Sequence, residues 1–391
     1  MTETDLQSPP IICTDVLRLG YVQLTDAAPL LIAQEKGFFR QHGLTVSLTP
    51  AASWASLRDR VAFGMLDGAQ MLSPMPIAAM LGLGGVRIDL RVLATLGRNG
   101  NTITLSNTLA AEIAAQLSKS PGPTRAAALG RALAQALANR RAGGRPVPVL
   151  AVVFPFSSHN YLLRHWLAAS GINPDHDIRL VVVPPQQVAD ALAAGAIDGF
   201  CAGEPWGSRA VDLRVGQIVL ATGDIWMNHP EKVLALTSRA AQDTDRAVAM
   251  VAAVMAAGAW LDQPENRAET THILAHALPT VPKEMIALAL HGLILATPDN
   301  DSEPRTRPGP GPAMIFHRDG ASYPFPAHGA WWLGQMRRWG HVAQGTDATI
   351  IGRIWRPEIW RQAAALSGQT APAIDIAPSG PTTTPSGVAA P

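Results

Sequence analysis

A short phrase occurs twice in this chain, about 130 residues apart. The first copy, GMLDGA, starts at Gly64 and runs into MLSPMP; the second, GAIDGF, starts at Gly195 and runs into AGEPW. Each follows an amphipathic stretch, and each Asp-Gly pair is expected to supply the tight turn that returns a helix to a parallel sheet. Two copies of one helix–turn–strand–helix unit predict an α/β fold with two lobes. Because open α/β sheets bind ligands at the carboxyl ends of their strands, two such lobes predict a binding cleft.

Length and charge narrow the class of protein. A chain of 391 residues is long enough for two domains with well-buried cores. Lysine and arginine total 31 against 30 aspartates and glutamates, so no charge excess attracts nucleic acid or an anionic membrane. The two cysteines, Cys13 and Cys201, are too few for a disulfide framework or a zinc site. No apolar run approaches the roughly 18–20 residues of a membrane helix. We expect neither membrane insertion nor direct nucleic-acid contact.

The first residues carry no export pattern. Met1 to Leu6 are acidic, and the first basic residue is Arg18, inside the first expected strand. A signal peptide needs a basic start followed by roughly 7–15 apolar residues. We therefore expect the protein to be cytoplasmic.

The order of apolar and polar segments predicts the domain boundaries. The polar loop 97–101 is expected to cross to the second lobe, and the chain to cross back near 215–226. A long helix over about 238–261 and further helices to about 295 then return to the first lobe, and an aromatic helix over 331–339 is expected to pack against the body of the protein. The predicted units are lobe 1 over 14–100 and 226–365, lobe 2 over 101–225, and a Pro/Thr/Ser-rich tail over 367–391 that is expected to be disordered. A Pro/Gly loop is expected over 299–312.

Side chains for catalysis are missing from the sequence pattern. No nucleophile motif, metal-ligand spacing or phosphate-binding loop is present, and the histidines do not have the spacing of a zinc site. We therefore expect no enzyme activity, no cofactor and no bound metal.

A small-anion site has better support. Ser157-Ser158-His159 puts backbone N–H groups and an imidazole at a helix start after a strand, where anions bind readily. The alternative is that His159 only caps its helix or packs under a neighbour. Ordinary roles are also open for the other polar and aromatic candidates: a core or rim position for Trp54, a solvated surface for Lys232, and simple turns for Asn99 and Asn101.

Several separate phrases resemble one family. They are LRLGY from Leu17, EKGFF from Glu35, ASW ending at Trp54, DGAQML from Asp67, GEPW from Gly203, HPEK ending at Lys232 and DGASYP from Asp319. Together, over about Leu17 to Trp360, they resemble the nitrate- and bicarbonate-binding proteins of ABC transporters, the NrtA/CmpA group. The resemblance implies a type II periplasmic-binding-protein fold, with the ligand held in a cleft between two lobes.

The resemblance also implies a ligand site. Carried over onto this sequence, it consists of Trp54, Asn99, Asn101, His159, Pro185 and Lys232. Nitrate binders of the family tend to have Gln where this chain has Asn101, a shorter amide. The bicarbonate binder has an acidic residue, used with calcium, where this chain has Lys232. A pocket of donors only would suit nitrate or nitrite, because bicarbonate has a hydroxyl that needs an acceptor.

Without an export pattern, the chain resembles most the cytoplasmic sensor branch of the family, NasS. That resemblance implies a protein that binds nitrate or nitrite, holds the RNA-binding antiterminator partner NasT, and releases it when the anion binds. RNA would be contacted only through that partner. The alternative is a substrate-binding protein of a nitrate ABC transporter whose true start lies upstream. A third hypothesis, an enzyme acting on a small anion, has no candidate nucleophile.

Overall fold

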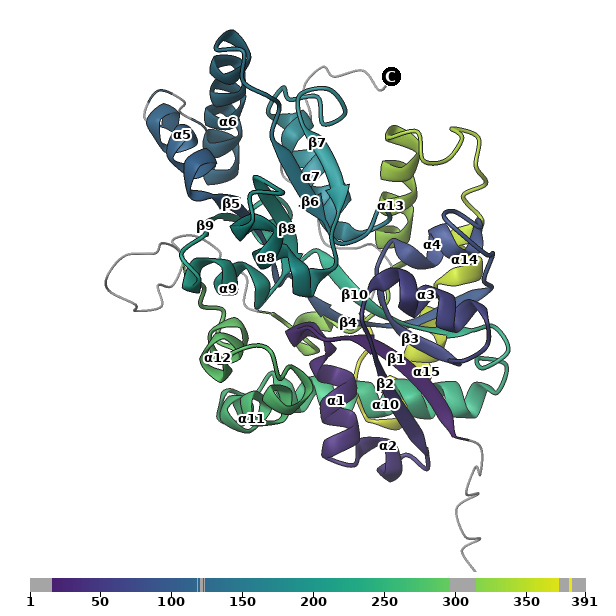
Figure 1. Ribbon diagram of the computed structural model, residues 1–391. Helices are drawn as coiled ribbons and strands as arrows, with labels where there is room; N and C mark the ends of the chain where they lie inside the picture. Colours follow the sequence, from purple (N-terminus) through teal and green to yellow (C-terminus); the bar gives the residue numbers. More distant parts are fainter. Residues whose placement is uncertain are drawn as a thin grey trace, which may run out of the picture.

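The computed structural model describes residues 16–117, 119, 122, 124–295, 314–372 and 380–381. Within them the strands form two five-stranded sheets, one in each lobe (Figure 1). The first sheet has the order β2-β1-β3-β10-β4 and the second β7-β6-β8-β5-β9. The strands of the first sheet are β1 (Leu17–Val22), β2 (Val46–Ala51), β3 (Gly68–Leu72), β4 (Leu90–Arg98) and β10 (Pro230–Thr237). Those of the second are β5 (Asn101–Ser106), β6 (Val149–Val152), β7 (Arg179–Val182), β8 (Gly199–Gly203) and β9 (Gly216–Ala221).

The two sheets are built alike. In each, three parallel strands are followed by one antiparallel strand that has crossed from the other half of the chain: β10 beside β3, and β5 beside β8. This confirms the predicted two-lobed α/β fold. The first sheet takes its strands from residues 17–98 and 230–237, and the second from 101–221. The domain boundaries themselves, and the order of the tail, stay predictions.

Helices cover both sheets and link them. Those between strands of the first sheet are α1 (Ala28–Glu35), α2 (Phe38–Gln41), α3 (Trp54–Ala62) and α4 (Met75–Met80). Those between strands of the second are α5 (Asn107–Leu117), α6 (Arg125–Ala142), α7 (Ser158–Ala169), α8 (Val188–Ala193) and α9 (Trp206–Asp212). After β10 come α10 (Thr244–Leu261), α11 (Arg267–Ala277), α12 (Lys283–Leu290), α13 (Pro326–Arg338), α14 (Ile350–Ile354) and α15 (Pro357–Leu366). Among the described residues, α10 alone is long and apolar enough to span a membrane, but most of it is buried like a core helix.

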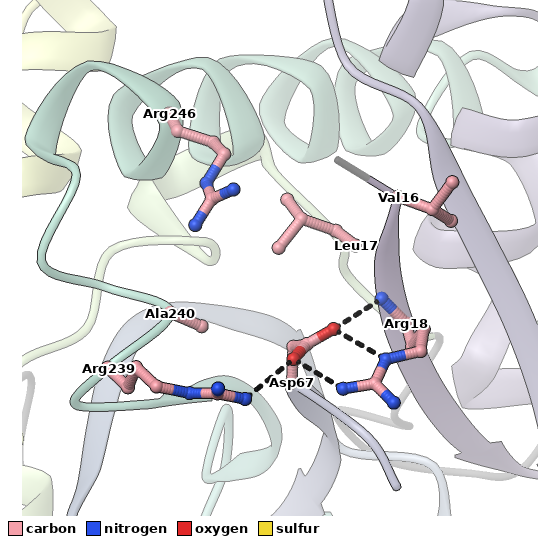
Figure 2. Close-up of a pocket in the computed structure, with 7 residues that line it drawn as sticks. All are labelled: Val16, Leu17, Arg18, Asp67, Arg239, Ala240 and Arg246. Atoms are coloured by element: carbon pink, nitrogen blue, oxygen red, sulfur yellow. Dashed lines mark hydrogen bonds and ion pairs between the residues drawn. The ribbon is translucent and has the colours of Figure 1, made fainter. Parts of the chain in front are cut away.

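The repeated phrase has the same structural role in both lobes. The Asp67 carboxylate accepts from the backbone N–H of Arg18 at the start of β1 (3.0 Å), and that of Asp198 from Val149 at the start of β6 (2.8 Å). Each aspartate therefore holds the amino end of the neighbouring parallel strand. Figure 2 shows the first of these aspartates, Asp67, which also accepts hydrogen bonds from the Arg18 guanidinium and forms an ion pair with Arg239. These residues line a pocket of about 330 Å³.

The turn itself is made by a different glycine from the one predicted. Gly64 and Gly195, three residues before each aspartate, have positive φ angles of 70° and 67° and end their helices. Gly68 and Gly199 instead allow close approach of the antiparallel strand. A Cβ on Gly68 would lie 2.6 Å from the Ala235 carbonyl oxygen, and one on Gly199 would lie 2.8 Å from that of Thr104.

The two chain crossings are tied to each other. After β4 the chain turns through Asn99, with a φ of 63°, and the return crossing turns through Asn228, with a φ of 61°. The Asn99 Oδ1 accepts from the Asn228 backbone N–H (2.9 Å), and its Nδ2 donates to Asn228 Oδ1 (3.2 Å). His229 then contacts the Thr222 hydroxyl through Nε2 (2.7 Å). These bonds make the crossings a single hinge region between the lobes.

Helix α13 lies beside both lobes (Figure 1). Its Trp332 donates through Nε1 to Ser73 of the first lobe (2.9 Å), and its indole lies 6.3 Å from the ring of Tyr161 on α7 of the second lobe. The Tyr161 hydroxyl in turn contacts His341 Nδ1, just after α13 (2.8 Å). The predicted aromatic helix is therefore real and packs on both lobes.

One central strand was missed from the sequence. β10 begins at Pro230 and carries Glu231 and Lys232, residues that read as a surface turn before an apolar run. Proline is tolerated here because it stands at the first residue of the strand. The predicted loop 299–312 and most of the predicted tail lie outside the described residues.

Candidate functional site

A buried ionic cluster lies where the strands of the two lobes meet. Lys232, near the start of β10, has no exposed surface, which rules out the solvated position open to it from the sequence. Its ammonium donates to Glu231 Oε1 (2.5 Å) and pairs with Asp26 Oδ2 (2.7 Å). The Gln70 amide on β3 fixes the other Asp26 oxygen (2.6 Å). An ammonium buried this deeply is stable only because both carboxylates are in contact with it.

An irregularity in β10 brings two neighbouring side chains to one place. Successive residues of a strand point to opposite faces, so Glu231 and Lys232 should diverge. The pairing of β10 with β4 shifts register between Pro230 and Lys232, and again between Lys232 and Val233. Such a bulge re-aims side chains locally. It lets an acid and a base that are adjacent in sequence form an ion pair inside the cleft.

The second lobe reaches this cluster through Glu231. Its Oε2 accepts from the Asn101 amide on β5 (2.5 Å) and from the Ser158 hydroxyl on α7 (2.6 Å). His159 Nε2 lies 3.7 Å from Glu231 Oε1. Thr25, in the 3₁₀ turn η1 (Thr25–Ala27), also donates to the Glu204 carbonyl oxygen at the end of β8 (2.7 Å). The carboxylate of Glu231 thus connects β10 of the first lobe to β5 and α7 of the second.

Three buried nitrogens beside this cluster have no hydrogen-bond partner among the described residues. They are Nε1 of Trp54 and both ring nitrogens of His159. Trp54 is the first residue of α3, whose amino end is capped by Ser53, and its ring lies 5.3 Å from the Lys232 ammonium. His159 does not cap α7, because Ser157 does. Trp54 Nε1 is a donor, and the neutral His159 ring has one N–H donor and one acceptor nitrogen. Buried donors without partners are costly, so Trp54 Nε1 and one nitrogen of His159 are ready to donate to a ligand oxygen.

Burial and neighbouring charges shift the pKa values of the ionisable groups in the cluster in different directions. Burial by itself raises the pKa of Glu231, but Lys232 and the nearby imidazoles of His159 and His229 outweigh it and lower that pKa to about 2. Burial opposes the Lys232 charge, yet Asp26 and Glu231 raise its pKa overall. Burial raises the pKa of Asp26 against the pull of Lys232. Burial also lowers the pKa of His159 to about 3, so this imidazole is neutral at pH 7.

Of the predicted site residues, the structure brings four together: Trp54, Asn101, His159 and Lys232. Asn99 lies in the hinge, where both ends of its amide bond to Asn228. The positive φ at Asn99 directs its side chain along the crossing strands. Asn99 is therefore not part of the cluster, although it is only two residues from Asn101. Pro185 starts the short 3₁₀ helix η2 (Pro185–Gln187) and is buried in the second lobe.

The sequence suggested a site made of donors only, but the buried cluster also contains acceptors. The Glu231 and Asp26 carboxylates are buried within it, and the Asn101 Oδ1 is a buried acceptor without a partner among the described residues. The Asp26 side chain pairs with Lys232, and no side chain caps the turn η1 in which Asp26 lies. Glu231 stands in the HPEK phrase, which is the sequence signal that could have pointed to it. In a regular strand, however, its side chain would point away from that of Lys232, so nothing in the sequence indicated that both lie in the site. Because acceptors are present, the hydroxyl of bicarbonate could find a partner here, and bicarbonate is not excluded on that ground.

Comparison with known proteins places the chain in a family. A family model described as the NMT1-like family matches residues 14–275, and this covers more than half of the chain. The chain belongs to the NMT1-like family. It is 32% identical to the nitrate/nitrite binding protein NrtA of Nostoc sp., over 92% of this chain and 79% of that protein. It is 34% identical to the bicarbonate-binding protein CmpA of a Synechococcus species, over 94% of this chain and 81% of the relative.

Two further matches refine this family membership. The nitrate import ATP-binding protein NrtC of Synechocystis is 36% identical over 90% of this chain, but the match spans only 50% of that relative. The crystal structure of the periplasmic nitrate-binding protein NrtA from Synechocystis superposes with a TM-score of 0.79 at 34% identity, covering 90% of this chain and 88% of the other. These relatives carry the names of binding and import proteins.

Proposed function

We propose that this protein binds nitrate or nitrite in the cleft between its lobes, as a binding protein without catalytic activity. The observation that carries the proposal is the set of unpartnered nitrogens on Trp54 and His159, beside the fully buried ammonium of Lys232. They come from opposite lobes, so a small planar oxyanion that bonded to both would hold the lobes together. The similarity to nitrate-binding relatives over nearly the whole chain supports the same ligand.

A bound anion needs a positive charge nearby, and the charge of Lys232 is already neutralised by carboxylates. The ammonium already contacts two carboxylates, and His159 is neutral in the free site. A bound monoanion beside the His159 ring would favour its protonated form, since an opposite charge within ~4–6 Å raises the pKa of a histidine. We therefore propose that the anion enters together with a proton that His159 takes up.

Calorimetry on the full chain tests the ligand. Nitrate and nitrite should bind, whereas sulfate, which is tetrahedral and carries two charges, should not. Bicarbonate is the informative competitor, because Asn101 Oδ1 and the carboxylates offer acceptors for its hydroxyl. If bicarbonate binds and nitrate does not, the ligand is bicarbonate, and the proposed anion site between the lobes still stands. Binding of none of these anions would end the proposal.

For the biological role, we propose the substrate-binding component of an anion importer. The support is the set of import proteins among the relatives, including an import ATP-binding protein that matches this chain over half its own length. In reconstituted vesicles, the liganded protein should stimulate ATP hydrolysis by the permease–ATPase complex of its own organism. An ATPase rate that is the same with and without the protein would contradict this role.

The sensor role, in the cytoplasm with a NasT-like antiterminator, remains a second proposal. It rests on the resemblance of this sequence to the sensor branch of the family, NasS. In that case the anion-free protein should hold the antiterminator in gel filtration, and millimolar nitrate should release it. Linkage requires the partner to weaken nitrate binding by the same factor, typically about 1–3 kcal/mol. A complex that persists at saturating nitrate and nitrite would remove this role.

A further inference from the structure

Two histidines on the outer side of the first lobe face each other one turn apart. His272 and His276 are four residues apart on α11, so they lie on the same face of that helix. Both are exposed, and their Nε2 atoms are 3.4 Å apart. Their ring planes are nearly perpendicular, at 85°, with centroids 4.9 Å apart. In Figure 1, α11 lies beside α12 and far from α13.

The distance between the two nitrogens fits a shared metal ion better than a hydrogen bond. An ordinary hydrogen bond from a ring N–H spans about 2.7–3.2 Å between heavy atoms. Two imidazole ligands on a tetrahedral zinc ion, each at about 2.0–2.1 Å, are about 3.3–3.4 Å apart. The side chains on α11 therefore already hold the spacing that a tetrahedral ion requires. Imidazole nitrogen is a ligand that suits Zn²⁺, Cu²⁺ and Ni²⁺.

The surroundings leave room for further ligands. Glu269 lies one turn before His272 on the same helix and pairs with Lys36 (2.8 Å) in a half-exposed contact that is easily exchanged. His276 also lines an open groove of about 480 Å³ together with Glu35, on α1. No group of three His, Cys, Asp or Glu ligands is present among the described residues, so water completes the coordination sphere unless Glu269 leaves Lys36 and turns to the ion. The end of α11 is tied to the first lobe by the Gln23 amide, which donates to the Ala277 carbonyl oxygen (2.7 Å).

We propose that His272 and His276 form a surface site for a divalent transition-metal ion, with solvent or a nearby carboxylate in the remaining positions. The site is separate from the anion cleft and does not depend on the proposed ligand. Because the Irving–Williams order holds for simple nitrogen sites, Cu²⁺ should bind more tightly than Zn²⁺ or Ni²⁺.

The test uses the untagged full chain after removal of metal with a chelator. Zn²⁺ is titrated by calorimetry, and one equivalent of Cu²⁺ is examined by electron paramagnetic resonance. The variants are His272→Ala and His276→Ala, with His176→Ala as the control, since His176 is an exposed histidine on the second lobe without a second imidazole one turn away. Glu269→Gln asks whether that carboxylate takes part. Nitrate titration of each variant verifies that the fold is intact.

The wild-type Cu²⁺ spectrum should show coupling to two imidazole nitrogens, and each alanine variant should show at most one. Zn²⁺ affinity should fall at least tenfold in each of these variants and stay unchanged in His176→Ala. Three results would overturn the proposal: no Zn²⁺ binding at 100 µM (roughly a hundredfold weaker than a micromolar site), a spectrum with fewer than two imidazole nitrogens in the wild type, or equal losses in the control. Intact nitrate binding would then show that the anion proposal stands without it.

Discussion

Replacing Lys232 by methionine should destabilise the protein far more than a comparable change at the surface. Methionine fills nearly the same volume but leaves Asp26 and Glu231, both buried, without their cation. Removing one partner of a buried ion pair typically costs about 3–5 kcal/mol, because the remaining charge is left unpaired in a low-dielectric site. Two carboxylates share this lysine, so we expect the upper part of that range.

The expected change in melting temperature follows from the size of the chain. At about 2.1 cal/mol/K per residue, the unfolding entropy of 391 residues is about 0.8 kcal/mol/K, so a loss of 3–5 kcal/mol lowers Tm by about 4–6 °C. Lys36→Met is the matched control. Lys36 also pairs with a glutamate at 2.8 Å, but both side chains are substantially exposed. That pair should contribute no more than about 1 kcal/mol.

The pH dependence identifies the cause. In the wild type the Glu231 pKa of about 2 lies below its unfolded value of 4.5, so its stabilisation is full above pH 4.5 and is lost as the pH falls towards 2. In Lys232→Met the same carboxylate loses the ammonium, which is the largest of the influences that lower its pKa against burial, so its pKa is higher than in the wild type. Protonation of Glu231 in acid removes an unpaired buried charge from the variant, whereas in the wild type it removes a stabilising ion pair. The difference in Tm between the two proteins should therefore shrink below about pH 5.

Adding Asp26→Asn to Lys232→Met should recover part of the loss, since one of the two unpaired charges is removed. Calorimetric melting of the four proteins between pH 3 and 8 measures all of these effects. If Lys232→Met melts within about 1 °C of Lys36→Met at pH 7, or if Asp26→Asn fails to rescue it, the buried ion-pair cluster does not exist as described, because these results leave less than about 1 kcal/mol of coupling.

The remaining predictions concern ligand binding and the hinge. His159→Ala should weaken nitrate binding by about 10- to 100-fold, the loss of one charge-assisted hydrogen bond; calorimetry measures it, and an unchanged affinity would place the anion elsewhere. Nitrate affinity should rise as the pH falls from 8 to 5, by at most about tenfold per unit, because the bound anion raises the His159 pKa from about 3 and the complex holds the extra proton; His159→Gln should abolish this slope. Asn99→Ala should lower stability by about 1–3 kcal/mol through the lost bonds to Asn228 and a strained positive φ, and small-angle scattering should show a shift in lobe closure. The control Asn173→Ala should not cause this shift, because the Asn173 side chain accepts only from the nearby Asp175 N–H within the second lobe. Gly199→Ala should destabilise by at least about 1–3 kcal/mol, because its Cβ meets the Thr104 carbonyl oxygen of β5; wild-type melting behaviour would contradict the close approach of the strands.

The repeated phrase was sufficient to predict two lobes of the same winding. Its information is local: a glycine that ends a helix, an aspartate that holds the next strand, and a glycine that admits a neighbouring strand all lie within five residues of each other. Both copies do the same work at Arg18 and at Val149. The family resemblance added the cleft, and four of the residues that it pointed to, Trp54, Asn101, His159 and Lys232, meet there.

The tertiary structure decided what those residues face. Lys232 reads as a surface lysine, because nothing near it in the sequence shows that β10 runs through the middle of a sheet. Its pairing with Asp26, more than 200 residues earlier in the chain, and the bulge that turns Glu231 to the same side depend on long-range strand register. Register follows from packing over both lobes, not from local preference. The sequence therefore specified the donors of the site, whereas only the assembled fold showed the carboxylates that neutralise them.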